Sequence, residues 1–226
     1  MRMKRETTLT KLSDALFLTI GCDGHYAGML ADHRARHLAY CDRWGIDYLA
    51  ENPADAIMDT FGRLDFILKW LKSGRYRFVF WIDADCIVSD FDHDMRETVP
   101  EWAWLGMTIA PERSAANIVH YQTGCMYWRA CRKSVEFIEC ILSVRNEPLL
   151  PVGSGLGQWN DQEVMNLLLL NEDDLKQGFV NLSPRWNMNT LGHDTEIVAA
   201  WHGRDNPMVR RRLMQEYAKS HDWRDK

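Results

Sequence analysis

The sequence has few of the features that mark a membrane, secreted or nucleic-acid-binding protein. None of its 226 residues lies in an apolar run near the roughly 20 residues that a membrane-spanning helix needs. The first 14 residues are polar, and the apolar run "ALFLTIGC" that follows is too short and too late for a signal peptide. The net charge of -5 argues against a nucleic-acid partner, which favours a basic protein. We therefore expect a soluble, cytoplasmic protein without a transmembrane anchor.

Cysteine pairing and dispersed positive charge are also lacking. The six cysteines form no CxxC pair and several lie in apolar runs, so we expect buried free thiols and no disulfide framework. The basic excess gathers at the two ends, in "MRMKR" and "VRRRL", and we interpret both as solvated surface. No repeat or linker divides the chain. We predict one domain, residues 1–226, with a core over about 15–205 and a helical segment over 207–226.

The first part of the chain alternates between two hydrophobic patterns. Short continuous apolar runs indicate buried strands, and apolar residues spaced by three and four indicate amphipathic helices. The predicted order is strand 15–21, helix 27–44, strand 46–52, helix 60–72 and strand 77–85. This alternation predicts an α/β fold with a mostly parallel sheet and helices on its faces.

The second part is less regular. We expect two strands and a helix, a glycine-containing loop, a helix from Asp161, and two short strands. Their ranges are 103–110, 119–129, 130–143, 151–158, 161–170, 178–187 and 196–203. The loop "VGSGLG" does not open a helix after a strand, so we do not interpret it as a dinucleotide fingerprint.

The stretch "RFVFWIDADCIVSD" (77–90) places two carboxylates at the end of a buried strand. Asp83 and Asp85 are suited to binding a hard divalent cation such as Mg²⁺ or Mn²⁺ together with phosphate oxygens. Alternatively, one would be a nucleophile and the other a general acid, or both would be ordinary turn residues. In open α/β sheets, ligands bind outside the carboxyl ends of the strands. A cation would also offset the cost of two charges beside a buried strand end.

Four further motifs follow this DxD in order: "QTGCMYWR", "DQEVMNLLL", "LSPRWNMN" and "WHG". With "WIDAD", the series resembles GT-A type nucleotide-sugar glycosyltransferases, in particular the retaining galactosyl/xylosyltransferase and glycogenin-like families. The resemblance covers residues 15–205. It implies transfer of a sugar from a nucleoside diphosphate donor, UDP first, to a hydroxyl acceptor, with retention of configuration and with Mn²⁺ or Mg²⁺ as cofactor.

The resemblance also implies residue roles. Asp83, Asp85 and His202 would bind the metal, while Asp161 and Gln162 would face the donor sugar as catalytic residues. The donor-binding residues would be Thr19, Gly21, Tyr26, Asp83, Ala84, Gln122, Thr123, Gly124, Asn187 and Gly203. Simpler interpretations remain open: a helix N-cap for Asp161, a strand-end histidine for His202, and polar flanks of a core tryptophan for Asn187.

The sequence departs from these families in two places. Gln122 stands where Asn is more usual, and "WHGRDNP" lacks the Lys that commonly follows the His-Gly and holds the phosphates. Arg204 would be a substitute, because a guanidinium binds phosphate well.

Two other functions fit the DxD. A haloacid-dehalogenase-type phosphohydrolase would use Asp83 as nucleophile with Mg²⁺, although its DxD usually ends the first strand of the fold. A non-catalytic carbohydrate- or metal-binding module would bind ligand without turnover. Sugar-stacking platforms are expected among Trp102, Trp104, Trp159 and Trp186, because aromatic faces suit sugar CH groups.

Overall fold

The computed structural model describes residues 13–22, 24–51, 60–109, 120–147, 160–189, 198–200 and 206–221. The first half contains β1 (Ala15–Ile20), α1 (Gly24–Trp44), β2 (Asp47–Glu51), α2 (Gly62–Lys72), β3 (Phe78–Ile82), β4 (Cys86–Val88), α3 (Met95–Thr98) and β5 (Leu105–Ile109). The second half contains β6 (Tyr121–Arg129), α5 (Arg132–Ser143), α6 (Asp161–Asn171), α7 (Asp173–Lys176), β7 (Phe179–Leu182), the 3₁₀ helix η1 (Pro184–Asn187), β8 (Met188–Asn189), β9 (Val198–Ala200) and α8 (Pro207–Ser220).

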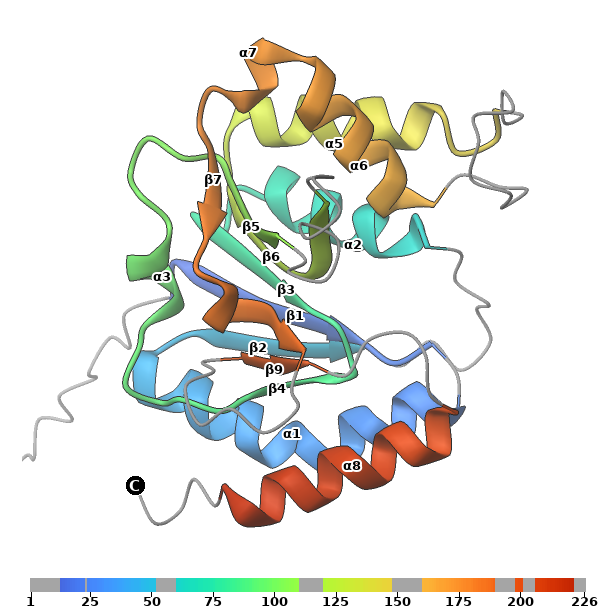
Figure 1. Ribbon diagram of the computed structural model, residues 1–226. Coiled ribbons are helices and arrows are strands. Elements are labelled where there is room, and N and C mark those ends of the chain that lie inside the picture. Colours follow the sequence, from blue (N-terminus) through green and yellow to red (C-terminus); the bar gives the residue numbers. More distant parts are fainter. Residues whose placement is uncertain are drawn as a thin grey trace, which may run out of the picture.

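The main sheet has the strand order β2-β1-β3-β6-β5-β7 (Figure 1). β1 pairs parallel with β2 and β3, and β5 pairs parallel with β7, whereas β6 runs antiparallel to both of its neighbours. The expected mostly parallel α/β sheet is therefore confirmed. A second, small sheet has the order β4-β9-β8 and includes β4, a strand directly after the DxD that the sequence did not indicate.

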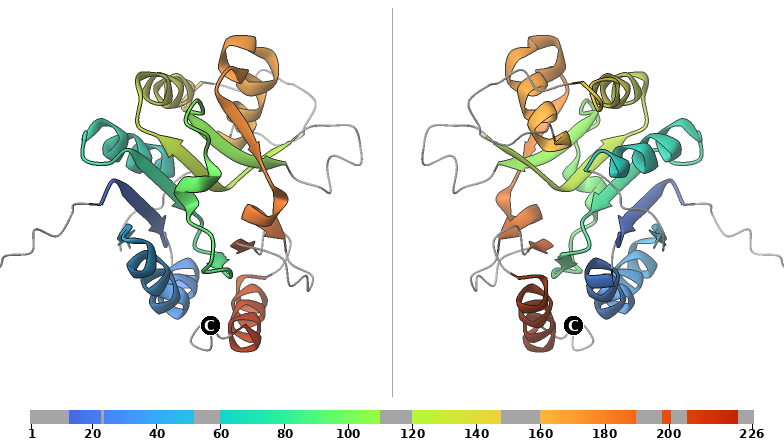
Figure 2. Two further views of the ribbon diagram at one scale, coloured as in Figure 1. Left: turned by 90° about the vertical axis from the view of Figure 1, so that its left-hand side faces the viewer. Right: turned by 90° about the vertical axis from the view of Figure 1, so that its right-hand side faces the viewer.

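Helices cover both faces of the main sheet, as the side views show (Figure 2). α2, α5 and α6 lie on one face, and α1 lies on the other with α8 packed along it. β1 is buried along its whole length, which is why it reads as a continuous apolar run. Its alternate side chains serve two cores: Phe17 joins the cluster next to α1, while Leu16 and Leu18 join the cluster under α2.

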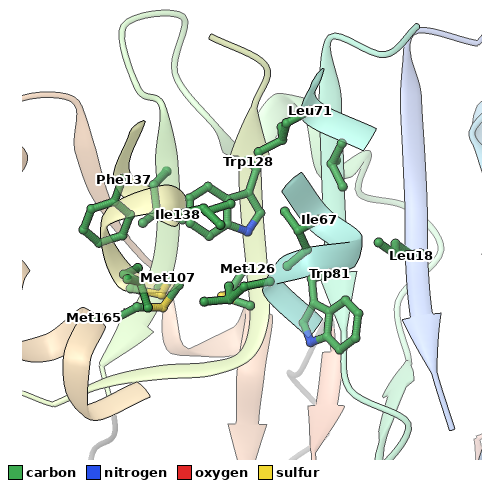
Figure 3. Packing of buried hydrophobic residues seen from close by; sticks show 14 of the residues in the cluster. Leu18, Ile67, Leu71, Trp81, Met107, Met126, Trp128, Phe137, Ile138 and Met165 are labelled. Atoms are coloured by element: carbon green, nitrogen blue, oxygen red, sulfur yellow. The ribbon is translucent and has the colours of Figure 1, made fainter. Parts of the chain in front are cut away.

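The cluster beneath α2, α5 and α6 is built from large side chains. Trp128 of β6 is fully buried, and Phe137 of α5 packs near it with ring centroids 6.3 Å apart. Methionines from β5, β6 and α6 fill the space between the sheet and the helices (Figure 3). This dense packing fixes the helices, and with them the polar residues at the helix ends.

Several boundaries differ from the sequence predictions. α1 begins at Gly24, before the expected residue 27, and residues 184–187 form η1 where a strand was expected. Of the predicted strand 196–203, the described part is β9, and the loop 151–158 lies outside the described residues. All six cysteines are free, but only Cys41, Cys86 and Cys125 are buried. Cys140 is exposed, because it lies on the outer face of α5.

Candidate functional site

The DxD lies where the sequence placed it, at the carboxyl end of β3. The backbone N–H of Asp83 donates to the carbonyl of Gly124 at 2.8 Å, so the antiparallel start of β6 meets the end of β3. β1 ends at the same edge, because it is parallel to β3. Asp83, Thr123 and the residues after Ile20 therefore share one edge of the sheet.

Arg63, in the first turn of α2, connects three parts of this edge. Its guanidinium lies 3.2 Å from an Asp83 carboxylate oxygen and 2.5 Å from Oδ2 of Asp161. It also donates to the Thr123 hydroxyl at 2.6 Å. These partners come from the ends of β3, β6 and α6, so one side chain fixes their relative positions.

Burial and neighbouring charges both act on the pKa values of the ionisable groups in this cluster. Burial raises the pKa of Asp161, and the Arg63 charge opposes that rise. Burial acts to lower the pKa of Arg63, but Asp161 and Asp83 outweigh it and raise that pKa above its ordinary value. The Asp161 side chain is 1% exposed and that of Asp83 is 26% exposed. Asp83 is thus the most exposed of the three charged side chains in the cluster.

Asp161 is not the N-cap of its helix. The cap is Asn160, whose side chain accepts from the Glu163 N–H at 2.9 Å. Asp161 is the first helical residue, and both of its carboxylate oxygens accept hydrogen bonds from Arg63. The capping interpretation is therefore wrong, and the carboxylate instead binds the Arg63 guanidinium.

Gln162 continues the polar network beside Asp161. Its side-chain oxygen accepts from the Thr123 hydroxyl at 2.8 Å, and its nitrogen contacts the His120 ring. One turn later Asn166 bonds the backbone of Tyr121 in both directions, at 2.6 and 2.9 Å. Gln162 and Asn166 thereby hold the start of α6 against the start of β6.

Asp85 lies in a separate environment. It is 4% exposed, and its Oδ2 accepts a 2.7 Å charged hydrogen bond from Arg210 of α8. The same Arg210 nitrogen donates to the Tyr26 hydroxyl at 3.1 Å. Partial burial and the Asp85 charge raise the pKa of Tyr26. Tyr26, predicted to line the donor pocket, is thus joined to the DxD through an arginine.

Thr19 and Gly21 are the other predicted donor residues at the end of β1. Thr19 is fully buried, and its hydroxyl has no hydrogen-bond partner among the described residues. Gly21 accommodates α1, because a Cβ there would lie 2.7 Å from the Ala27 Cα. Glycine is therefore the residue that lets the helix start so close to the strand end.

Three other predicted donor residues, Ala84, Gln122 and Asn187, are buried. Ala84 is buried, and Gln122 accepts from the Thr108 hydroxyl at 3.3 Å. Asn187 is buried at the end of η1, which packs against β5, β6 and β9. The structure thus joins Asp83, Thr123, Asp161 and Gln162 in one network and Asp85 and Tyr26 in another.

A metal at this edge would bind to the DxD carboxylates. Their oxygens suit Mg²⁺ or Mn²⁺ chemically, so the residues fit the ion in type. Within the described ranges no three His, Cys, Asp or Glu side chains are grouped to bind a metal. His202 and Gly203 lie outside those ranges. The register pairs Cys86 with Ala200, so β9 ends opposite the residue after Asp85.

Sequence reasoning missed Arg63 and misjudged "VRRRL". Arg210 is buried, whereas Arg211 is partly buried and pairs with Asp32, and Arg212 is exposed and pairs with Glu216. A signal existed for Arg210: it shares a helix face with Met214 and Tyr217 at four- and three-residue spacing. Arg63 has no such signal, because its partners are 20, 60 and 98 residues away.

The predicted sugar-stacking role fails for the three tryptophans that lie within the described residues. Trp104 and Trp186 are core residues, 3% and 5% exposed. Trp102 is exposed but precedes β5, which runs parallel to β3, so it lies at the opposite edge from Asp83. Trp159 lies outside the described residues.

Comparison with known proteins gives fold relatives. No family model matches the chain, and no curated protein matches its sequence. A solved glycosyltransferase involved in glycosylation of the major capsid of PBCV-1 matches with a TM-score of 0.65 and 12% identity, over 89% of this chain and 98% of that one. The chain has the GT-A glycosyltransferase fold.

Two further solved structures share this GT-A fold. Apo GlyE of Streptococcus pneumoniae TIGR4 matches with a TM-score of 0.55 and 13% identity, over 93% of this chain and 64% of its own length. The galactosyltransferase LgtC, solved with donor and acceptor sugar analogs, matches with a TM-score of 0.50 and 16% identity, over 92% and 96%. No helix within the described residues is long and apolar enough to cross a membrane.

Proposed function

We propose that this chain is a metal-dependent glycosyltransferase. It would move a sugar from a nucleoside diphosphate donor, with UDP as the first nucleotide to test, to a hydroxyl acceptor with retention of configuration. The observation that carries the proposal is the Asp83–Arg63–Asp161 cluster at the carboxyl edge of a GT-A sheet. In open α/β sheets this edge is where ligands bind.

The proposal gives each acidic residue a task. Asp83 and Asp85 would hold a Mn²⁺ or Mg²⁺ ion, with His202 as a third ligand. Such an ion neutralises the charge that develops on the leaving nucleoside diphosphate. Asp83 suits the task because its side chain is 26% exposed, and Arg63 and the Trp81 indole N–H fix its orientation.

Gln162 and Asp161 would act together at the donor sugar. Asp161 is buried and grips Arg63 through both oxygens, so it would orient the arginine and offset its charge. Gln162 is only partly buried and is held by Thr123, and we expect its amide to meet the sugar hydroxyls. Thr19, Gly21 and Tyr26 would lie along the base and ribose, and Gln122, Gly124 and Asn187 near the sugar.

Donor hydrolysis tests this function without knowledge of the acceptor. The purified protein is incubated with a panel of nucleotide sugars and Mn²⁺, and release of nucleoside diphosphate is measured. We expect release from one donor class, lost in EDTA and lost in Asp83→Asn. Asp92→Asn, which removes an exposed carboxylate that pairs with Arg43, is the matched control and should keep activity.

Two outcomes would count against a transferase. Release of inorganic phosphate from simple phosphoesters, with a covalent phosphate on Asp83, would establish the phosphohydrolase. Donor binding without any release in the presence of varied sugar acceptors would favour a binding module. No observation in the structure favours either alternative.

A further inference from the structure

The Arg210–Asp85 ion pair joins the last helix to the DxD. The two side chains are 125 residues apart in sequence, meet at 2.7 Å, and are 8% and 6% exposed. A buried carboxylate without a counter-ion would be costly, so Arg210 stabilises the charge of Asp85. The carboxylate expected to bind a metal thus already has a cation.

The backbone that carries Arg210 is firmly fixed. Met214 is fully buried against Met29 and Ile87, and the neighbouring Arg211 forms two hydrogen bonds to Asp32 of α1, at 2.6 and 2.9 Å. α1 and α8 lie side by side along this contact (Figure 1). Gly28 permits the close approach, since a Cβ there would lie 2.5 Å from the Arg211 guanidinium. A change of partner at Asp85 therefore moves a side chain, and the helix stays in place.

We propose that Arg210 is an exchangeable counter-ion of the DxD, which competes with a divalent cation for Asp85. This inference rests on the proposed metal-dependent function. A guanidinium and a divalent ion beside the same carboxylate repel each other strongly in a site that excludes water. Without a further anion, Arg210 and the metal ion share the single negative charge of Asp85. Asp85 consequently binds the metal weakly under these conditions.

The competition has a consequence for the donor. A nucleoside diphosphate brings negative charge to the same place and offsets the excess positive charge that metal binding creates. Metal and diphosphate should then strengthen each other's binding, and by linkage the two enhancements are equal. Arg210 thereby makes loading of the metal depend on the donor, so that the site does not hold a bare ion.

The test is a Mn²⁺ titration followed by the electron paramagnetic resonance signal of free Mn²⁺, with and without UDP. The variant Arg210→Met removes the charge and keeps apolar bulk. We expect Arg210→Met to bind Mn²⁺ alone roughly tenfold more tightly, or better, because the competing charge is gone. The enhancement by UDP should shrink. Arg212→Met, which removes an exposed charge on the same helix that pairs with Glu216, should titrate like the wild type.

Each alternative outcome has a distinct meaning. Unchanged or weaker Mn²⁺ binding in Arg210→Met, with UDP still bound in a metal-dependent way, would overturn the exchange and leave the proposed function intact. Absence of Mn²⁺ binding in every protein, with or without UDP, would overturn both. A double variant, Arg210→Met with Asp85→Asn, should lose the gained affinity and so assigns it to Asp85.

The effect of Mn²⁺ on thermal stability is a second test of the proposal. It can also be applied to a variant that folds poorly. Mn²⁺ should raise the melting temperature of Arg210→Met more than that of the wild type, because the ion supplies the missing charge and binds only the folded state. If Arg210→Met does not fold, Arg210→Gln keeps a hydrogen bond to Asp85 without the charge and should show the same gain in Mn²⁺ affinity. Equal Mn²⁺ affinity in Arg210→Gln and the wild type would contradict the proposal.

Discussion

Arg63 is the residue on which the geometry of the candidate site depends most. It satisfies the carboxylates of Asp83 and Asp161 and the hydroxyl of Thr123 at once. Removing one partner of a buried ion pair leaves the other charge uncompensated.

We expect Arg63→Met to lower the free energy of unfolding by about 3 kcal/mol or more, since Asp161 would be left buried and charged. Urea denaturation monitored by circular dichroism measures the loss. Adding Asp161→Asn should recover part of it, because the uncompensated charge is removed. Independent, additive effects of the two substitutions would show that the pair is not energetically coupled.

Two buried histidines on α1 make stability depend on pH. Burial lowers the pKa of His37 to about 3 and that of His33 to about 4. Both pKa values lie below those of the unfolded chain, so the unfolded state takes up protons first on acidification. Their stabilising contribution is full above about pH 6.5 and is lost as the pH falls toward these lowered values.

Each histidine should therefore cost up to about 1.4 kcal/mol of stability per pH unit below pH 6.5. Unfolding free energies measured between pH 7 and pH 5 check this slope. His37→Phe should flatten it, because a ring that cannot be protonated then packs on Phe17 and Tyr48. Tyr48→Phe, which removes a buried hydroxyl without a partner among the described residues, should leave the slope unchanged.

At the scale of elements, the edge depends on a close approach between β1 and α1. Gly21→Ala would force its Cβ to within 2.7 Å of the Ala27 Cα and 2.8 Å of the Ala27 nitrogen. Because the neighbouring atoms are backbone, the start of α1 must shift, at a cost of about 1–3 kcal/mol. Thermal unfolding of Gly21→Ala and of the wild type measures this loss of stability.

A nearby glycine provides the control for this prediction. A Cβ at Gly24 meets nothing within 4 Å. Gly24→Ala should therefore leave stability unchanged or raise it slightly. Similar losses in the two variants would contradict the steric explanation. Because Gly21 is at the predicted donor edge, Gly21→Ala should also weaken nucleotide binding, whereas Gly24→Ala should not.

α8 should behave as part of the same cooperative unit, as the proposed single domain 1–226 requires. Met214 is fully buried between α8 and the rest of the chain. Met214→Ala should lower stability by about 2–4 kcal/mol while unfolding stays a single transition. A separate early transition for α8, observed by hydrogen exchange, would show that the helix is an independent unit.

At the scale of the whole molecule, the sequence predicted the regular parts of the fold well. Continuous apolar runs such as 78–82 identified the buried strands, and the alternation with helices gave the mostly parallel sheet. The antiparallel run of β6 was not predicted, because periodicity does not report strand direction. β4 was not predicted, because its three residues are too few to show a hydrophobic pattern.

The candidate site was predicted only in part, because sequence patterns report local features and not contacts between distant residues. The DxD is visible because charge interrupts an apolar run within a few residues. Arg63 meets Asp161 across 98 residues of sequence, so only the folded chain brings them together. Arg210 was hidden among three consecutive arginines of which only one faces inward.

The central claim is that this edge of the sheet binds a nucleoside diphosphate through a metal. Calorimetric titration of the protein with UDP, GDP, CDP and ADP, each with Mn²⁺ and with EDTA, tests it most directly. The account predicts that one diphosphate binds tightly with Mn²⁺ and not in EDTA. It is contradicted if none of the four binds, or if binding is the same without metal.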